Sequence, residues 1–506
     1  MTSSSSFLQH PRGLFYLFFA ELWERFSFYG MRALLTLYMT KELFVELPHK
    51  ESFSIGIYAS YGALVYTTPL LGGFVADKFL GYSRSVMLGA IFMVIGHFIM
   101  AFENLVCFYT ALALLIVGNG FFKPNISSIL GSLYAQGDAK RDAGFGIFYM
   151  AINIGAMLSP IVCGWIAEEY GWHYGFGLAG IGMLIGLLFF QSGRRKGAFG
   201  DYNFPVKSLR KPFLVYTGAI LLVPLVAVLL VFHQSLGYLL NTALGIAIIS
   251  LIFMGFKLSK AEISRIVVIL ILAFFVTIFW AFFEQGGSSL TLFADKNVRL
   301  VGINASQTNS INPFFIVLLT FPFSTLWVWL DRKDMNPSIP LKFSLGIFQL
   351  GIGFGIFAAS ALWVDATGKV PMLFLLAGYF FITTGELCLS PVGLSMVTKL
   401  SPAQMTAFMM GIWFLASAFA HHLGGWIGKL TTRSASDFTP QNTFDVVTQW
   451  IVKLCTKNFS VSSSENFESL HAYTTVFVQI ALIAMVVGFV IAALTPLLKK
   501  MMYGVK

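Results

Sequence analysis

Long apolar runs separated by short polar connections make up most of the chain. Because a helix rises about 1.5 Å per residue and the hydrocarbon layer is about 30 Å thick, each run can cross a bilayer as one helix. We expect fourteen spans, near residues 14–39, 55–77, 85–102, 105–130, 145–167, 173–190, 213–232, 236–256, 266–293, 311–330, 341–363, 370–397, 404–428 and 472–498. The pattern predicts an all-α integral membrane protein.

The composition agrees with this interpretation. Of the 506 residues, 57% are hydrophobic and 11% are charged, against about 45–50% and about 25% in a soluble domain. These values exclude an ordinary soluble domain and a secreted disulfide scaffold. The net charge of +10 would suggest nucleic acid in a soluble protein, but here the basic residues lie in the connections between apolar runs. Such a distribution indicates membrane topology, so we expect membrane lipid and no nucleic acid as a partner.

The basic residues also orient the chain. An even number of spans places both termini on one side, and 21 of the 33 Lys and Arg residues lie on that side. The opposite side has 9, and the remaining 3 lie inside spans. Since cytoplasmic connections carry the excess of Lys and Arg, we expect both termini to be cytoplasmic.

The seventh and eighth spans differ from the others, because residues 213–256 contain no Asp, Glu, Lys or Arg. Without this lipid-facing hairpin, six spans precede a basic linker and six follow it, as in transporters with two repeated halves. We therefore expect bundles at 1–195 and 261–506, with linker and hairpin at 196–260 and an extracytoplasmic loop at 430–470. The pattern from Gly73 to Arg84, GxxxDKxxGxxR, resembles a loop motif of the major facilitator superfamily, and this resemblance implies that fold.

Seven charged residues lie within the predicted spans, and each costs about 2.5–3.5 kcal/mol at mid-bilayer on insertion scales. Unpaired, they would together cost about 20 kcal/mol, so they must pair with one another or line a wet cavity. They are Glu21, Glu24, Arg25, Arg32, Lys123, Glu284 and Glu386.

Helical geometry suggests which of these charges meet. At about 100° per residue, the polar groups of the first span share an arc of about 140°. Arg32 and Glu284 each lie about 27 Å above the cytoplasmic start of their spans, so they can meet near the outer mouth. Lys123 and Glu386 lie deeper, and Pro124 should open the helix next to Lys123 because proline has no backbone N–H.

Uncharged residues supply weaker signals. Asn153 and Asn312 either present hydrogen-bonding groups to a cavity or bind neighbouring backbone. Trp280 and Trp413 either wall a pocket or pack. The pair His421-His422 has no further metal-binding group at a suitable spacing, so we expect no metal site and no cofactor. No catalytic constellation occurs at mid-membrane depth, which argues against an enzyme.

Several of these residues belong to motifs that resemble those of the proton-dependent oligopeptide transporter (POT) family, within the major facilitator superfamily. The first span reads ELWERFSFYG, similar to the family signature ExxERFxYYG. Further similar segments occur in the expected order: Gly72 to Gly81, Gly118 to Asn125, Phe148 to Gly155, Trp280 to Gln285, Asn312-Pro313, Gly385 to Leu387 and Gly411 to Phe414.

The resemblance implies a proton-coupled symporter that imports di- and tripeptides by alternating access. Alternatives are the same fold carrying nitrate or a peptide-like metabolite, and a peptide sensor that does not transport. Glu21, Glu24, Arg25 and Lys123 would couple protons, and Arg32 with Glu284 would form the gate. Substrate-binding residues would be Arg25, Tyr29, Arg32, Tyr66, Lys123, Asn153, Trp280, Asn312, Glu386 and Trp413, with cations holding the peptide carboxylate and Glu386 its ammonium.

Two departures from the family pattern concern Phe28 and Ala59. Phe28 replaces the first tyrosine of the signature, which removes a hydroxyl, and Ala59 occupies a position where animal relatives carry histidine. Coupling should therefore not need a histidine. The extra hairpin resembles that of prokaryotic members, which implies a bacterial inner membrane. We expect the protein to function as a monomer.

Overall fold

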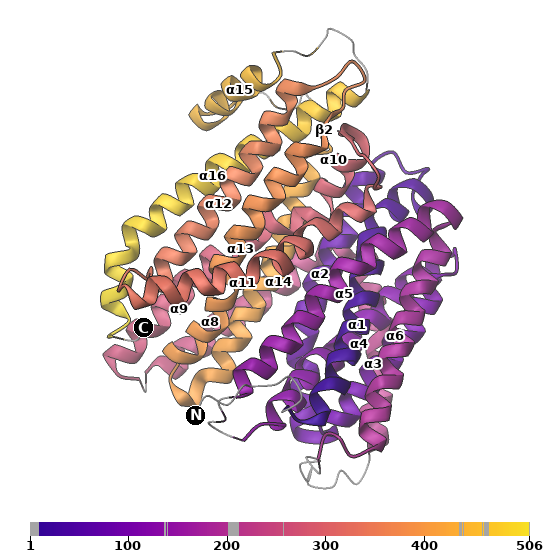
Figure 1. Cartoon of the computed structure of the whole chain (residues 1–506), viewed down its shortest axis with the longest axis vertical. Coiled ribbons are helices and arrows are strands. Elements are labelled where there is room, and N and C mark those ends of the chain that lie inside the picture. Colours follow the sequence, from indigo (N-terminus) through magenta and orange to yellow (C-terminus); the bar gives the residue numbers. More distant parts are fainter. Residues whose placement is uncertain are drawn as a thin grey trace. The chain divides into compact units, whose positions relative to one another are not determined.

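The computed structural model describes residues 10–135, 138, 140–200, 212–256, 258–434, 438, 440–457, 459 and 465–504. Almost all of these residues are helical (Figure 1). The chain divides into two compact units. The first unit comprises Met1–Tyr38 and Leu64–His233, and the second comprises Met39–Ala63 and Gln234–Lys506.

The first unit is built around α1, which packs against α5 and α6, while α3 packs against α4 and α6. The last helix of the unit, α7, lies on α4. The unit also holds the second half of α2. Its helices are α1 (Arg12–Tyr38), α2 (Lys50–Val75), α3 (Tyr82–Met100), α4 (Leu105–Ser132), α5 (Lys140–Tyr170), α6 (Trp172–Arg195) and α7 (Pro212–Val231).

In the second unit, α12 packs against α13 and α16, and α9 packs against α14. Two short parallel strands, β1 (Val298–Arg299) and β2 (Val370–Pro371), join the loops at one end of the unit. The helices are α8 (Leu236–Gly255), α9 (Lys260–Phe283), α10 (Ser289–Asn297), α11 (Ile311–Arg332), α12 (Ile339–Ala359), α13 (Met372–Leu400), α14 (Thr406–Leu430), α15 (Thr443–Cys455) and α16 (Glu465–Met501).

The prediction of an all-α membrane protein is confirmed. Within the described residues, 11 helical segments are long and apolar enough to span a membrane. Three more helices, α1, α2 and α14, have 27, 26 and 25 residues and lie at predicted spans. The long helices thus coincide with the fourteen predicted runs, and α10 and α15 are additional short ones.

Two local predictions were wrong. The run at 266–293 is not one helix, because α9 ends at Phe283 and a 3-10 turn, Glu284–Gly287, precedes α10. Two consecutive glycines in this turn favour the break, since glycine destabilises a helix interior. In contrast, α4 continues through Pro124 without a break, so one missing hydrogen bond is tolerated within a packed helix.

The compact units differ from the predicted bundle boundaries. Residues 39–63 belong to the second unit, so α2 contributes to both units. The charge-free hairpin is also divided, because α7 packs on α4 in the first unit and α8 packs on α14 in the second. Residues 201–211 and 257 of the predicted linker and hairpin, and residues 435–437, 439, 458 and 460–464 of the loop at 430–470, lie outside the described residues. The bundle assignment at 1–195 and 261–506 stays a prediction.

Close backbone contact between α3 and α4 depends on glycine. A Cβ atom added to Gly89 would lie 2.5 Å from the carbonyl oxygen of Gly118 and 2.7 Å from the amide nitrogen of Phe122. A Cβ atom added to Gly118 would in turn lie 2.8 Å from the Gly89 oxygen. Small residues allow such contacts between membrane helices, and van der Waals packing then holds the helices together.

Gly89→Ala should therefore lower the free energy of unfolding by about 1–3 kcal/mol, the usual cost of overpacking. The matched control is Gly146→Ala in α5, where a Cβ atom has no neighbour within 4 Å. The control should be neutral or slightly stabilising, because alanine favours a helix more than glycine. Thermal unfolding in detergent compares them, and a Gly89→Ala protein that melts at or above the control would contradict the close contact.

Candidate functional site

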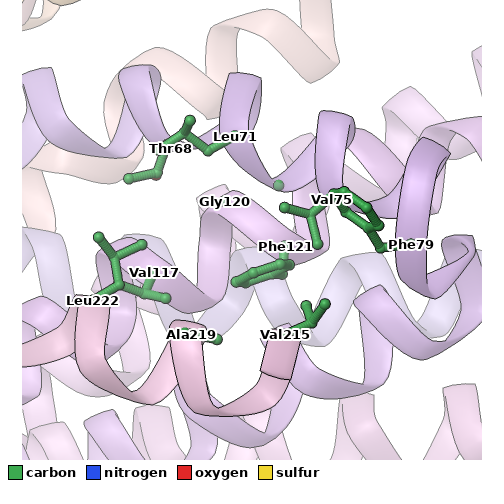
Figure 2. A pocket seen from close by; sticks show the side chains of 12 residues that line it. Thr68, Leu71, Val75, Phe79, Val117, Gly120, Phe121, Val215, Ala219 and Leu222 are labelled. Atoms are coloured by element: carbon green, nitrogen blue, oxygen red, sulfur yellow. The ribbon is translucent and has the colours of Figure 1, made fainter. Parts of the chain in front are cut away.

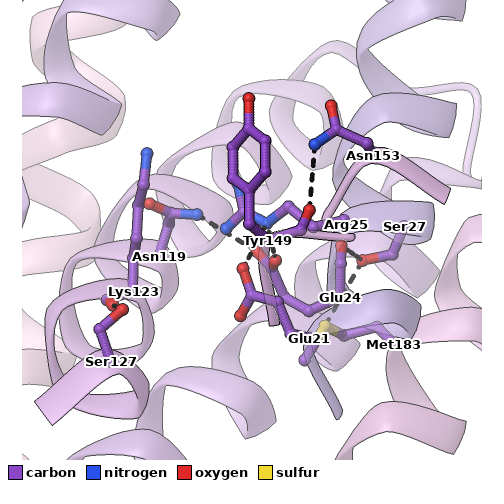
Figure 3. Close-up of polar contacts among 10 residues, drawn as sticks. All are labelled: Glu21, Glu24, Arg25, Ser27, Asn119, Lys123, Ser127, Tyr149, Asn153 and Met183. Carbon is purple, nitrogen blue, oxygen red and sulfur yellow. Dashed lines mark hydrogen bonds and ion pairs between the residues drawn. The ribbon is translucent and has the colours of Figure 1, made fainter. Parts of the chain in front are cut away.

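Three charged residues form a buried cluster on α1. Glu21, Glu24 and Arg25 lie three and four residues apart, which places them on one helix face. The Nε atom of Arg25 is 3.0 Å from Oε1 of Glu21 and also contacts Oε2 of Glu24. Figure 3 shows the three side chains converging, and each is at most 4% exposed. One guanidinium thus contacts two carboxylates, so the trio has a net negative charge when both acids are ionised.

Helix α4 supplies a further partner to this cluster. The side-chain nitrogen of Asn119 donates a hydrogen bond to Oε1 of Glu24 at 3.3 Å (Figure 3). Asn119 was not among the predicted site residues. The available signal was an asparagine between two glycines, Gly118 and Gly120, within an otherwise apolar run.

Lys123 lies one turn beyond Asn119 and contacts an aromatic ring. Its Nζ atom is 4.4 Å from the ring centre of Tyr66 on α2, a cation–π contact. This contact unites two predicted substrate-binding residues. Direct pairing of Lys123 with the acids stays a prediction, whereas the pairing of Arg25 with Glu21 and Glu24 is present.

The cluster retains unused hydrogen-bonding capacity. Among the described residues, Oε2 of Glu21, Nη2 of Arg25 and Oδ1 of Asn119 are buried without a hydrogen-bond partner. Unpaired buried polar atoms are costly and therefore uncommon, and water or a ligand can satisfy them. The cluster can thus accept a proton on a carboxylate and can donate from Arg25 to an incoming anion.

Aromatic residues next to the acids contact the two arginines. The guanidinium carbon of Arg25 is 5.4 Å from the ring centre of Phe28, and that of Arg32 is 6.0 Å from the ring centre of Tyr29. Phe28 therefore keeps the aromatic contact with Arg25 although it has no hydroxyl. Asn153 donates to the backbone oxygen of Tyr149 at 3.0 Å (Figure 3), one of the two alternatives for this side chain.

The second unit holds a separate buried acid, Glu386 on α13. The side-chain nitrogen of Asn312, at the start of α11, lies 3.0 Å from Oε2 of Glu386 and 3.0 Å from Oγ1 of Thr383. Glu386 is only 8% exposed. Two predicted residues thus meet, although 74 positions separate them. Thr383 was missed because one threonine in an apolar helix usually bonds its own backbone, as it also does here with Tyr379.

Glu284, the predicted acid of the gate, lies in the turn between α9 and α10. Its Oε2 atom is 3.6 Å from Nδ1 of His421 on α14, and both side chains are buried. The next residue, Gln285, donates 2.9 Å hydrogen bonds to the backbone oxygens of Ala281 and Gly424, which fixes the turn against α14. His421 was considered only as a metal ligand. The gate pair of Glu284 with Arg32 stays a prediction.

The two tryptophans pack within the second unit. The ring of Trp280 lies 4.9 Å from that of Phe283, centre to centre. Trp413 is 6% exposed and lies so close to Gly393 that a Cβ atom there would be 2.6 Å from Cζ2 of the indole. Both tryptophans therefore pack against neighbouring residues of the second unit. Contact of either residue with substrate stays a prediction.

Comparison with known proteins identifies the family. Residues 83–451 match the model of the POT family, so the chain belongs to the POT family of membrane transporters. The chain is therefore a multi-pass membrane protein of a transporter family, not an enzyme. The resemblance inferred from the sequence motifs is confirmed.

Individual relatives match over almost their whole lengths. An uncharacterized transporter, YclF of Bacillus subtilis, is 36% identical over 99% of this chain and 96% of its own. Dipeptide and tripeptide permease B of Salmonella typhimurium is 32% identical over 99% of this chain and 98% of its own. A crystal structure of peptide transporter POT in complex with sulfate matches with a TM-score of 0.81 at 33% identity, covering 99% of this chain and 97% of that chain. The prediction of a major facilitator fold agrees with this match.

The gate can be tested by reversing its charges. If Arg32 and Glu284 pair when the outer mouth is closed, Arg32→Glu places two acids together and should favour the outward-open state. Transport should fall about tenfold or more, because a loss of about 1.4 kcal/mol corresponds to tenfold and breaking a buried pair costs more. The double variant Arg32→Glu, Glu284→Arg should recover closure and part of the transport.

The measurement is the reaction of a cysteine, introduced at the outer mouth, with an impermeant maleimide in the wild type, both single variants and the double variant. A double variant that is no more closed than the worse single variant would refute direct pairing. Arg32 would then be reassigned to the substrate carboxylate.

Proposed function

We propose that this protein is a proton-coupled symporter that imports di- and tripeptides by alternating access. The observation that carries the proposal is that the first unit has buried basic side chains able to hold a carboxylate, and the second has a buried acid able to hold an ammonium group. The first unit presents Arg25 and Lys123, and the second presents Glu386 with Asn312. A short peptide is a zwitterion whose carboxylate suits the cations and whose ammonium suits Glu386.

Names of relatives support the choice of substrate. A Yersinia enterocolitica protein that is 36% identical over 86% of this chain is named a peptide transporter. A crystal structure of a mutant peptide transporter POT holds alafosfalin, with a TM-score of 0.79. Both names describe those proteins. For this chain, the buried acid Glu386 is our reason for proposing the same substrate class.

Coupling would take place in the cluster on α1. When a proton neutralises Glu24 or Glu21, the Coulomb attraction on Arg25 weakens. Arg25 then becomes available to the peptide carboxylate, for which the buried Nη2 atom is a ready donor. Substrate and proton would thus bind together, and their release on the other side would restore the ion pairs.

Two alternative functions, nitrate transport and peptide sensing without transport, can be distinguished from peptide symport. Nitrate lacks an ammonium group to meet Glu386, so the buried Asn312–Glu386 pair disfavours it. A sensor would bind peptide without moving it, and counterflow of labelled dialanine in vesicles of purified protein separates binding from transport. We further propose a bacterial inner membrane, which the extra hairpin favours. Both termini would lie in the cytoplasm, because the predicted topology places 21 of the 33 Lys and Arg residues on their side.

An inward proton gradient should drive accumulation of dialanine in proteoliposomes, because protonation in the cluster favours peptide binding. Accumulation that a protonophore does not change would contradict coupling. Glu24→Gln should abolish gradient-driven uptake while preserving peptide exchange, since exchange needs no net proton movement. An equal loss of both activities would assign Glu24 to folding or binding instead.

Peptide orientation can be tested at Glu386. Glu386→Gln should weaken peptides with a free amino terminus by about 10-fold to 100-fold, because a hydrogen bond to a charged group contributes about 1.5–3 kcal/mol. N-acetylated peptides provide the matched comparison, since they present no ammonium. Competition binding with both ligand series measures the difference, and equal weakening would reject the proposed orientation.

A further inference from the structure

A cavity of about 290 Å³ lies in the first unit between α7 and the pair α2 and α4. Figure 2 shows the side chains that line it. Its lining comes from α2 and the turn that follows it, from α4, and from the first half of α7: Thr68, Leu71, Gly72, Val75, Phe79, Val117, Gly120, Phe121, Val215, Gly218, Ala219 and Leu222. Unlike the charged cluster on α1, the cavity has no ionisable side chain in its lining.

The cavity has a buried floor and an exposed rim. Val117 and Phe121 of α4 are 1% and 6% exposed, whereas Leu71 of α2 is 56% exposed. The hydroxyl of Thr68 is already bonded to the backbone oxygens of Leu64 and Ile116. No lining side chain therefore offers a free polar group, and a ligand of this site must be apolar.

The helices that form the rim show whether the opening faces water or lipid. It is formed by α2, α4 and α7, and the latter two are among the apolar helices able to span a membrane. On α7, the lining residues lie about 5–15 Å from the helix start at Pro212, which is in one leaflet. Acyl chains therefore surround the opening, and an apolar void open to them is filled more favourably than it is left empty.

The basic residue Lys78 directly precedes the lining residue Phe79 in the chain. Lys78 is exposed and belongs to the same π-helical turn, Ala76–Leu80, as the lining residue Phe79. Basic side chains at the membrane surface attract anionic headgroups. We propose that the cavity is a binding site for one acyl chain of an anionic phospholipid, with the headgroup near Lys78.

The site shares its walls with the substrate machinery. Thr68 lies two residues after Tyr66 on α2, and Gly120 lies three residues before Lys123 on α4. A Cβ atom at Gly120 would lie 2.8 Å from Cβ of Thr68, so the two helices touch at the cavity. A bound acyl chain therefore supports the α2–α4 contact that carries the Tyr66–Lys123 pair.

The test uses the full-length protein in nanodiscs with phosphatidylglycerol carrying a photoreactive diazirine in one acyl chain, followed by peptide mass spectrometry. Wild-type protein should be labelled on the floor residues Val117 or Phe121, which bulk lipid does not reach. Gly218→Phe places a ring in the cavity, since a Cβ atom there has no neighbour within 4 Å. Floor labelling should then fall about tenfold, equivalent to about 1.4 kcal/mol.

The matched control is Gly245→Phe on α8, which also has no neighbour within 4 Å of an added Cβ atom and should leave floor labelling unchanged. A phosphatidylcholine probe should label the floor more weakly than phosphatidylglycerol, and Lys78→Gln should remove this preference. Labels confined to exposed residues such as Leu221 and Leu225, or unchanged labelling in Gly218→Phe, would overturn the proposal. So would labelling by a free fatty-acid probe but not by the phospholipid, since the occupant would then have another source.

Discussion

Charged side chains inside membrane-spanning helices must be satisfied within the protein, because the bilayer offers neither water nor counter-ions. This constraint orients the helices of each unit. The face of α1 with Glu21, Glu24 and Arg25 turns inward, where α4 adds Asn119. In the second unit, α13 turns Glu386 toward Asn312 on α11. The charge-free α7 and α8 have no such requirement, and most of their surface is exposed.

Ion pairing inside the protein also reduces the cost of the buried charges on α1. Arg25 is shared between two acids, so neutralising one acid leaves the guanidinium paired with the other. An isolated buried pair lacks this property, because removing one partner leaves an uncompensated charge. Several atoms of the cluster are also buried without a hydrogen-bond partner, so the cluster keeps unused hydrogen-bonding capacity.

Much of the fold followed from the sequence because the thickness of the bilayer sets the length of every apolar segment that crosses it. The charges within spans were equally visible, since each is costly in lipid. Local backbone behaviour was harder to predict. Pro124 is accommodated within α4, whereas the glycines after Glu284 end α9, and the difference depends on packing by neighbouring helices. The contacts of Asn119, Thr383 and His421 were missed because their partners lie on other helices, and only the tertiary structure brings those helices together.

The division of α2 between the two units has a consequence for biosynthesis. Residues 39–63 pack within the second unit, where Lys41 contacts Asp295 and Glu51 contacts Lys296. These partners are separated by 254 and 245 positions. At about 5–20 residues per second, the ribosome needs about 12–50 s to supply them. Residues 39–63 therefore lack these partners until the carboxy-terminal part of the chain has been synthesised, so the first half of α2 reaches its final contacts late.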